Sequence, residues 1–150
     1  MTTKLRYWYP EIVTALFVLL FLYTALSKLQ DYTGFARAML HSPVIASFAR
    51  ELAIIIPVIE IGIVALLIVP ATRMVGLIAS TVIMALFSAY IAYMLVTSSE
   101  LPCTCGGILE HLSWAAHLAI NIFFFLLGIF SVLISNKNFI MINRRSRTPV

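Results

Sequence analysis

Leu52-Ala-Ile-Ile-Ile-Pro-Val-Ile-Glu-Ile-Gly-Ile-Val-Ala-Leu-Leu-Ile-Val69 is an apolar run interrupted by one charge, and it decides the fold class. Three further apolar stretches occupy residues 11–30, 74–97 and 112–135. Each is close to the roughly 20 residues that a helix needs to cross a hydrocarbon core. Because lipid cannot hydrogen-bond the peptide groups, continuous helices are expected, and the alternation typical of a membrane barrel strand is absent. The sequence predicts an all-α membrane protein, a four-helix transmembrane bundle in a lipid bilayer.

The composition supports the same class. Hydrophobic residues make up 62% of the 150 residues and the mean hydropathy is +1.04, which leaves too little polar surface for a water-soluble globule. Neither an internal repeat nor a second domain is visible, so residues 1–150 are predicted to form one membrane domain. Residues 30–50 are less apolar, and we expect two short helices at the membrane interface there, with Phe35 and Met39 toward lipid or the bundle and Arg37 and Arg50 in water.

Positive charges predict the orientation. Seven of the ten Lys and Arg residues would lie on one side of the membrane: Lys4, Arg6, Arg73, Lys137, Arg144, Arg145 and Arg147. By the positive-inside rule, both termini and a basic tail of residues 136–150 are predicted to be cytoplasmic. In a bacterial inner membrane, residues 98–111 would then face the periplasm. Contact with anionic lipid explains a pI near 9.3, so no nucleic-acid partner is expected.

The only two cysteines, Cys103 and Cys105, lie in Leu101-Pro-Cys-Thr-Cys-Gly-Gly-Ile108. In an oxidising periplasm they can form a disulfide, and a ring closed across one residue is strained, which makes the bond labile. Gly106 and Gly107 let the chain turn and leave the sulfurs open to an incoming thiolate. This pattern predicts a catalytic pair that exchanges electrons with a thioredoxin-like protein or a disulfide-bearing client. It does not indicate which cysteine attacks first.

Two other interpretations of the cysteine pair stay open. Two thiolates with His111 or His117 would suit Cu(I) or Zn(II), as in a copper-handling membrane protein. A purely structural disulfide is the third interpretation, although a link between residues two apart constrains the unfolded chain very little.

Glu60 is an acidic residue deep in the second apolar stretch. A carboxylate at membrane depth costs about 2.5–3.5 kcal/mol on insertion scales, so it should face inward and be paired or protonated. Lys28, near the end of the first stretch, is the expected partner, although it could also extend to the interface. The pair is interpreted either as a structural ion pair or as a proton or ligand site.

The fourth stretch carries a stripe of small and polar residues at helical spacing: Ser113, His117, Asn121, Gly128, Ser131 and Ser135. This face should look into the bundle, where such side chains join helices by hydrogen bonds. His117 has a second interpretation, because imidazole titrates near neutral pH and could contact a quinone carbonyl or relay a proton from a thiol. Asn121 would support His117 in this role.

The chain resembles the DoxX-like and MauE membrane proteins over about residues 8–135, because three sequence motifs occur in the same order as in those proteins. They are Leu22-Tyr-Thr-Ala-Leu-Ser-Lys28, Ile56-Pro-Val-Ile-Glu60 and Cys103-Thr-Cys-Gly-Gly107. The resemblance implies a redox-associated membrane protein. MauE-like members are linked to maturation of a disulfide-rich periplasmic methylamine dehydrogenase subunit, and DoxX-like relatives to sulfur-compound oxidation coupled to quinone. The Cys-x-Cys-Gly-Gly form is closer to the MauE side, and no residue of the chain itself points to methylamine.

These observations together predict a membrane thiol:disulfide redox protein that acts through Cys103 and Cys105. Electrons would leave to a quinone or to a partner protein, because a single cysteine pair excludes an internal relay of disulfides. Lys28, Glu60 and His117 would be supporting residues. The rival prediction is a non-catalytic assembly or maturation factor, in which the cysteine segment is a docking point.

Overall fold

The computed structural model describes the backbone of residues 3–40, 45–97 and 114–145, and the side chains of residues 8–40, 45–97 and 114–135. All regular secondary structure in these ranges is helical. The elements are α1 (Thr3–Gln30), α2 (Tyr32–Leu40), the 3-10 turn η1 (Ala46–Phe48), α3 (Ala49–Ile68), α4 (Arg73–Thr97) and α5 (Trp114–Arg145). The predicted all-α fold is confirmed. The helix α5 continues beyond Ser135 into the predicted basic tail of residues 136–150, as far as Arg145.

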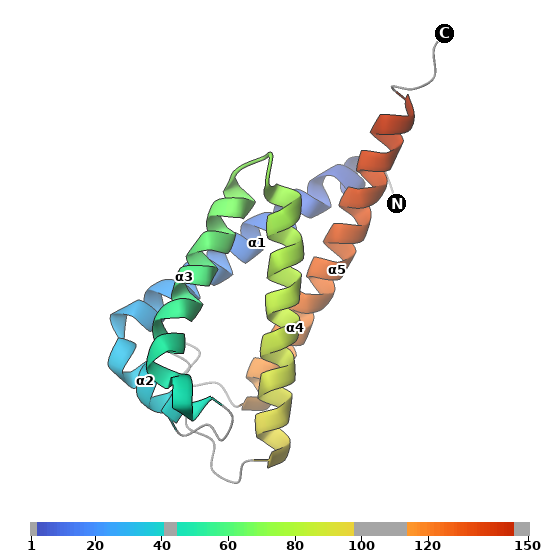
Figure 1. The fold of residues 1–150 in the computed structure, drawn as a ribbon. Helices are drawn as coiled ribbons and strands as arrows, with labels where there is room; N and C mark the ends of the chain where they lie inside the picture. Colours follow the sequence, from blue (N-terminus) through green and yellow to red (C-terminus); the bar gives the residue numbers. More distant parts are fainter. Residues whose placement is uncertain (1–2, 41–44, 98–113, 146–150) are drawn as a thin grey trace.

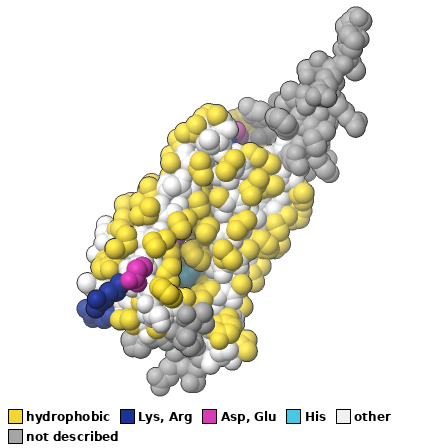
Figure 2. Space-filling model, viewed as in Figure 1, with side chains coloured by type: hydrophobic (Ala, Val, Ile, Leu, Met, Phe, Trp, Pro, Cys, Tyr) yellow, Lys and Arg dark blue, Asp and Glu magenta, His cyan; other side chains and the backbone are white. Residues whose placement is uncertain are grey.

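Four helical segments are long and apolar enough to cross a membrane: Trp8–Gln30, Ala46–Ile68, Arg73–Thr97 and Trp114–Ser135. They pack as a bundle in which α1 lies mainly against α3 and α5, and α4 mainly against the same two helices (Figure 1). Each long helix therefore has two neighbours, and the predicted four-helix bundle is confirmed. Hydrophobic side chains cover most of the visible face, as a lipid-facing surface requires (Figure 2).

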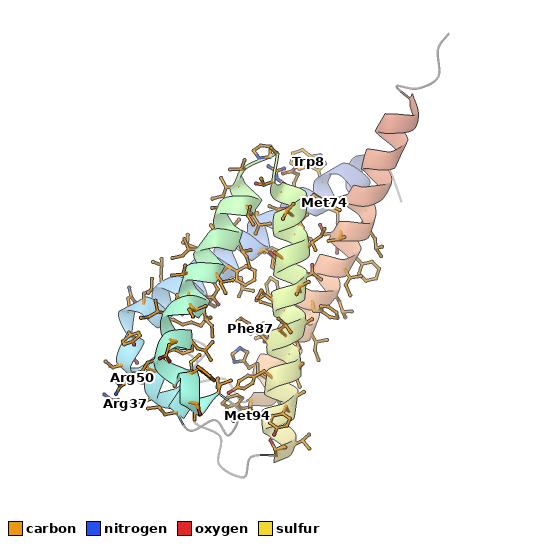
Figure 3. The ribbon with its side chains drawn as sticks, viewed as in Figure 1. Trp8, Arg37, Arg50, Met74, Phe87 and Met94 are labelled. Carbon is orange, nitrogen blue, oxygen red and sulfur yellow. The ribbon has the colours of Figure 1, made fainter. Side chains whose placement is uncertain are left out.

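The helices alternate in direction, so the two ends of the bundle differ. The turn between α3 and α4 lies at the end where α1 begins and α5 leaves the bundle, while α2 lies at the opposite end (Figure 1). Trp8 and Met74 mark the first end, and Arg37 and Arg50 mark the second (Figure 3). We refer to them as the turn end and the α2 end.

Helix α2 is the short insertion expected between the first two spans. Asp31 caps it, because its Oδ1 accepts a hydrogen bond from the backbone N–H of Gly34 at 3.0 Å. One face of α2 packs on the start of α3 through a cluster of buried residues: Phe35, Ala36, Met39, Ala49 and Ala53. Arg37 and Arg50 are exposed, as predicted. The second short helix is a single 3-10 turn that leads into α3.

The apolar core of the bundle lies between the long helices. Its buried members are Val13, Phe17, Phe21, Ile63, Val64, Leu67, Leu77 and Met84. Phe17 stacks on Phe21 with ring centroids 5.9 Å apart and meets Phe124 of α5 at 5.8 Å. These aromatic contacts join α1 to α5 and add to the packing that holds helices together in lipid.

Two glycines let the helices approach closely. A Cβ on Gly76 would lie 2.9 Å from the Leu67 backbone nitrogen and 3.0 Å from the Leu66 carbonyl carbon, so α4 contacts the α3 backbone there. A Cβ on Gly128 would lie 3.2 Å from the Phe17 ring and would also collide with the Thr81 hydroxyl. Small residues thus bring the helices together near the turn end, in the manner of membrane helix interfaces.

Gly76→Ala should destabilise the bundle by about 1–3 kcal/mol, because the new methyl group meets backbone atoms that cannot rotate away. Gly62→Ala is the matched control, since a Cβ at that exposed position has nothing within 4 Å. Unfolding in mixed detergent micelles, followed by far-UV circular dichroism, measures both. Equal stability of the two variants would contradict the close contact between α3 and α4.

Candidate functional site

Lys28 and Glu60 form a buried ion pair inside the bundle. The Lys28 Nζ donates to the Glu60 Oε1 at 2.5 Å, and the two side chains are only 11% and 2% exposed. The predicted pairing between the first and second spans is confirmed. Its two members come from α1 and α3, which lie side by side, so the pair also fixes which helices are neighbours.

Aromatic rings and a hydroxyl surround the pair. The Lys28 Nζ lies 5.6 Å from the Phe35 ring centroid and 5.9 Å from that of Phe87, within the range of cation–π attraction. Thr24, one helical turn before Lys28, lies close enough to interact with the Glu60 carboxylate. Helices α1, α2, α3 and α4 therefore all contribute to this site.

His117 brings the fifth helix to the same place. It is half-buried on α5 and lies close enough to Lys28 for the ammonium charge to act on the imidazole. Figure 2 shows histidine colour at the bottom of a recess in the hydrophobic face, and His117 is the one histidine among the residues whose side chains are described. Phe87 lies on α4 at the level of this recess (Figure 3). We call Thr24, Lys28, Glu60 and His117 the polar centre.

Two buried polar atoms near this level have no hydrogen-bond partner. The Glu60 Oε2 is one, although the Oε1 of the same carboxylate is paired. The Nδ2 of Asn121, one turn beyond His117 on α5, is the other. An unpaired buried polar group costs about 1–3 kcal/mol, and more when it is charged. The polar centre can therefore take a further hydrogen-bonding group at little cost.

The polar stripe of the fourth span faces the bundle, as predicted, wherever its side chains are described. Asn121, Gly128 and Ser131 are buried, and His117 and Ser135 are half-buried. Ser131 has a buried hydroxyl without a partner, but it lies more than three turns along α5 from His117. The stripe thus serves helix packing at Gly128 and contributes a functional candidate only at its first members.

The cysteine segment lies outside the described residues. This applies to Cys103, Cys105, Gly106, Gly107 and His111, and also to Ser113 of the stripe, so their predicted roles stay predictions. Among the described residues no group of three or more His, Cys, Asp or Glu could hold a metal ion. The alternative set of Cys103, Cys105 and His111 is untested by that finding. The helices that flank the segment end at Thr97 and begin at Trp114.

Several neighbours of the site were not predicted from the sequence. No sequence pattern marks Phe35, Phe87 or Thr24 as a neighbour of the Lys28–Glu60 pair. A second ion pair joins the Arg73 Nη1 to the Glu11 Oε1 at 2.5 Å, near the turn end. This pair could have been predicted from the sequence, because Glu11 is the only acidic residue before Asp31.

Comparison with known families identifies the group to which these landmarks belong. A family model described as "Methylamine utilisation protein MauE" matches residues 6–134. The chain belongs to the MauE family. The match covers the four spans, the polar centre and the cysteine segment of this MauE protein, and the resemblance to MauE proteins drawn from the sequence is confirmed. No curated protein and no solved structure gives a significant match.

Lys28→Met should destabilise this MauE protein by about 3–5 kcal/mol, because it leaves the buried Glu60 without its cation. The double variant Lys28→Met/Glu60→Leu should recover most of that loss, since neither charge remains. Unfolding midpoints in mixed micelles, compared as a double-mutant cycle, measure the coupling.

The matched control for this cycle is the Arg73–Glu11 pair, whose side chains are 29% and 43% exposed. Arg73→Met should cost only about 0–1 kcal/mol, because water already screens the pair. If Lys28→Met proved as mild as Arg73→Met, the buried pair would not be a structural requirement.

Proposed function

We propose that this MauE protein is a membrane thiol:disulfide redox factor that acts in methylamine utilisation. Its Cys103–Cys105 pair exchanges electrons with a thioredoxin-like or disulfide-bearing client protein on the periplasmic side of a bacterial inner membrane. The observation that carries the proposal is the family match over residues 6–134, which includes the only two cysteines of the chain. The family description names methylamine utilisation as the process, and the cysteine pair provides the thiols for disulfide exchange.

The topology of the bundle supports this proposal. The cysteine segment joins the end of α4 to the start of α5, and both of these helix ends lie at the α2 end (Figure 1). His117 follows the first residue of α5 by three residues, which is less than one turn. The polar centre therefore lies in the half of the bundle where α4 ends and α5 begins.

The proposed thiol exchange conserves electrons and protons. A client thiolate attacks one sulfur of the Cys103–Cys105 disulfide and forms a mixed disulfide, and the second client thiolate then releases it. The client loses two electrons and two protons and gains a disulfide, while Cys103 and Cys105 become thiols. A quinone of the membrane then accepts the two electrons and two protons and becomes a quinol. Lys28, Glu60, His117 and Asn121 support this last step, in which protons must move inside the bundle.

Replacing both cysteines with serine should abolish thiol exchange without affecting membrane insertion. Thr104→Ser is the matched control, because it changes the residue between the two sulfurs and keeps both thiols. Alkylation and mass shift across a series of dithiothreitol or glutathione buffers should give a reversible transition between roughly −120 and −270 mV in the unaltered protein.

Other outcomes of this experiment would favour the rivals. Thiols that react only after a chelator is added, with stoichiometric copper in the washed protein, would support metal handling. A client that matures normally in cells with the double serine variant would support a non-catalytic assembly factor and would overturn the exchange mechanism. The same alkylation with a membrane-impermeant reagent tests the periplasmic location, since cytoplasmic thiols would stay unlabelled.

A further inference from the structure

The polar centre has the features of a ligand site and not only of a structural ion pair. We propose that it binds a quinol, a lipid-soluble molecule with a ring hydroxyl, whose hydroxyl donates a hydrogen bond to the Glu60 Oε2. The inference deepens the proposed function, because it assigns a place to the electron acceptor, but the binding itself does not require the cysteines.

The hydrogen-bonding capacity of the centre selects a donor. The Glu60 side chain is 2% exposed, its Oε1 is paired with Lys28, and its Oε2 has no partner, because the nearby Thr24 hydroxyl donates to the Phe21 carbonyl oxygen at 3.2 Å. A carboxylate oxygen can only accept, so the group that completes it must carry an O–H or N–H. Burial makes this bond stronger than the same contact in water.

The charge of the centre selects a neutral ligand. Lys28 and Glu60 neutralise each other at 2.5 Å, and the described residues around them are the neutral hydroxyl of Thr24, the rings of Phe35 and Phe87, and His117. A charged ligand would bring an uncompensated charge to membrane depth, which is costly. A hydroxyl brings a donor without a net charge.

The surroundings of the centre select an apolar ring. Phe35 and Phe87 lie within 6 Å of the Lys28 Nζ and present aromatic surface on two sides of it. A planar ring can lie against such faces, where aromatic pairs contribute beyond the area they bury.

Access to the centre is from the lipid side. Helices α3 and α4 contact each other less extensively than α1 contacts α3 or α4 contacts α5, and their close approach is at Gly76, near the turn end. The recess in Figure 2 opens through the hydrophobic face at the level of Phe87, between α3 and α4 (Figures 1 and 3). A ligand dissolved in the bilayer can reach it from there.

The same centre can also hold the oxidised form. A quinone carbonyl accepts hydrogen bonds, and the Lys28 ammonium, His117 and the unpaired Nδ2 of Asn121 can donate them. On reduction by the Cys103 and Cys105 thiols, the quinone gains two electrons and two protons and becomes a quinol, while the thiols become a disulfide. One of the new hydroxyl groups then meets the Glu60 Oε2.

Binding of decylubiquinol and decylubiquinone to the purified full-length protein in nanodiscs tests this proposal by equilibrium titration. The unaltered protein should bind decylubiquinol saturably. Lys28→Met/Glu60→Leu should bind it about tenfold more weakly or worse, since the hydrogen bond to the carboxylate is gone. The matched control Arg73→Met/Glu11→Gln, which removes the ion pair near the turn end, should keep the affinity.

Glu60→Gln gives a second variant, which distinguishes the two redox forms of the ligand. It keeps the size of the side chain and should weaken the quinol more than the quinone, because only the quinol donates to the Oε2. Non-saturable uptake, or one affinity shared by the unaltered protein, Lys28→Met/Glu60→Leu and Glu60→Gln, would overturn the site.

The cysteine variants separate this inference from the proposed function. Cys103→Ser/Cys105→Ser should bind decylubiquinol as the unaltered protein does. Saturable, Glu60-dependent binding in a protein without thiol exchange would leave the site standing and remove the proposed function. Thiol exchange in a protein that binds no quinol would do the reverse.

Discussion

A carboxylate enclosed in a membrane bundle must have a cation beside it, and the arrangement of this protein depends on that constraint. The cation beside Glu60 of α3 is Lys28 of α1, and this ion pair fixes the two helices as neighbours. The same ammonium attracts the Phe35 ring of α2, so the short helix after the first span is held over the pair. Breaking such a pair costs far more than its formation contributes, which gives it a strong influence on helix order.

The two halves of the bundle are packed differently. Toward the turn end, Gly76 and Gly128 bring helices into close contact around the phenylalanines of α1, and this half holds the fold together. Toward the α2 end, the polar centre keeps unpaired hydrogen-bonding capacity among apolar side chains. A membrane protein tolerates such polar groups mainly where they act. Helix α4 ends and helix α5 begins at that same end, so the polar centre lies in the half of the bundle where these two helices are joined.

The sequence was sufficient to predict the helical class, the four spans and the Lys28–Glu60 pair. Long apolar runs and an isolated intramembrane charge have few physical solutions, so these inferences follow directly. It could not predict that Phe35 and Phe87 flank Lys28, because an aromatic residue in a membrane helix faces lipid as readily as the bundle. The second of the two predicted interfacial helices is one 3-10 turn, Ala46–Phe48, that leads directly into α3. The roles of Cys103 and Cys105 stay predictions.

The central claim is that electrons pass from the cysteine pair to a quinone held in the bundle. The most direct measurement is the oxidised fraction of Cys103 and Cys105, by alkylation and mass shift, in membranes with their quinone pool and in matched membranes without it. The pair should be largely a disulfide when quinone is present and should accumulate as thiols when quinone is removed, with oxidation restored by added decylubiquinone. An oxidised fraction that does not respond to quinone would contradict the claim.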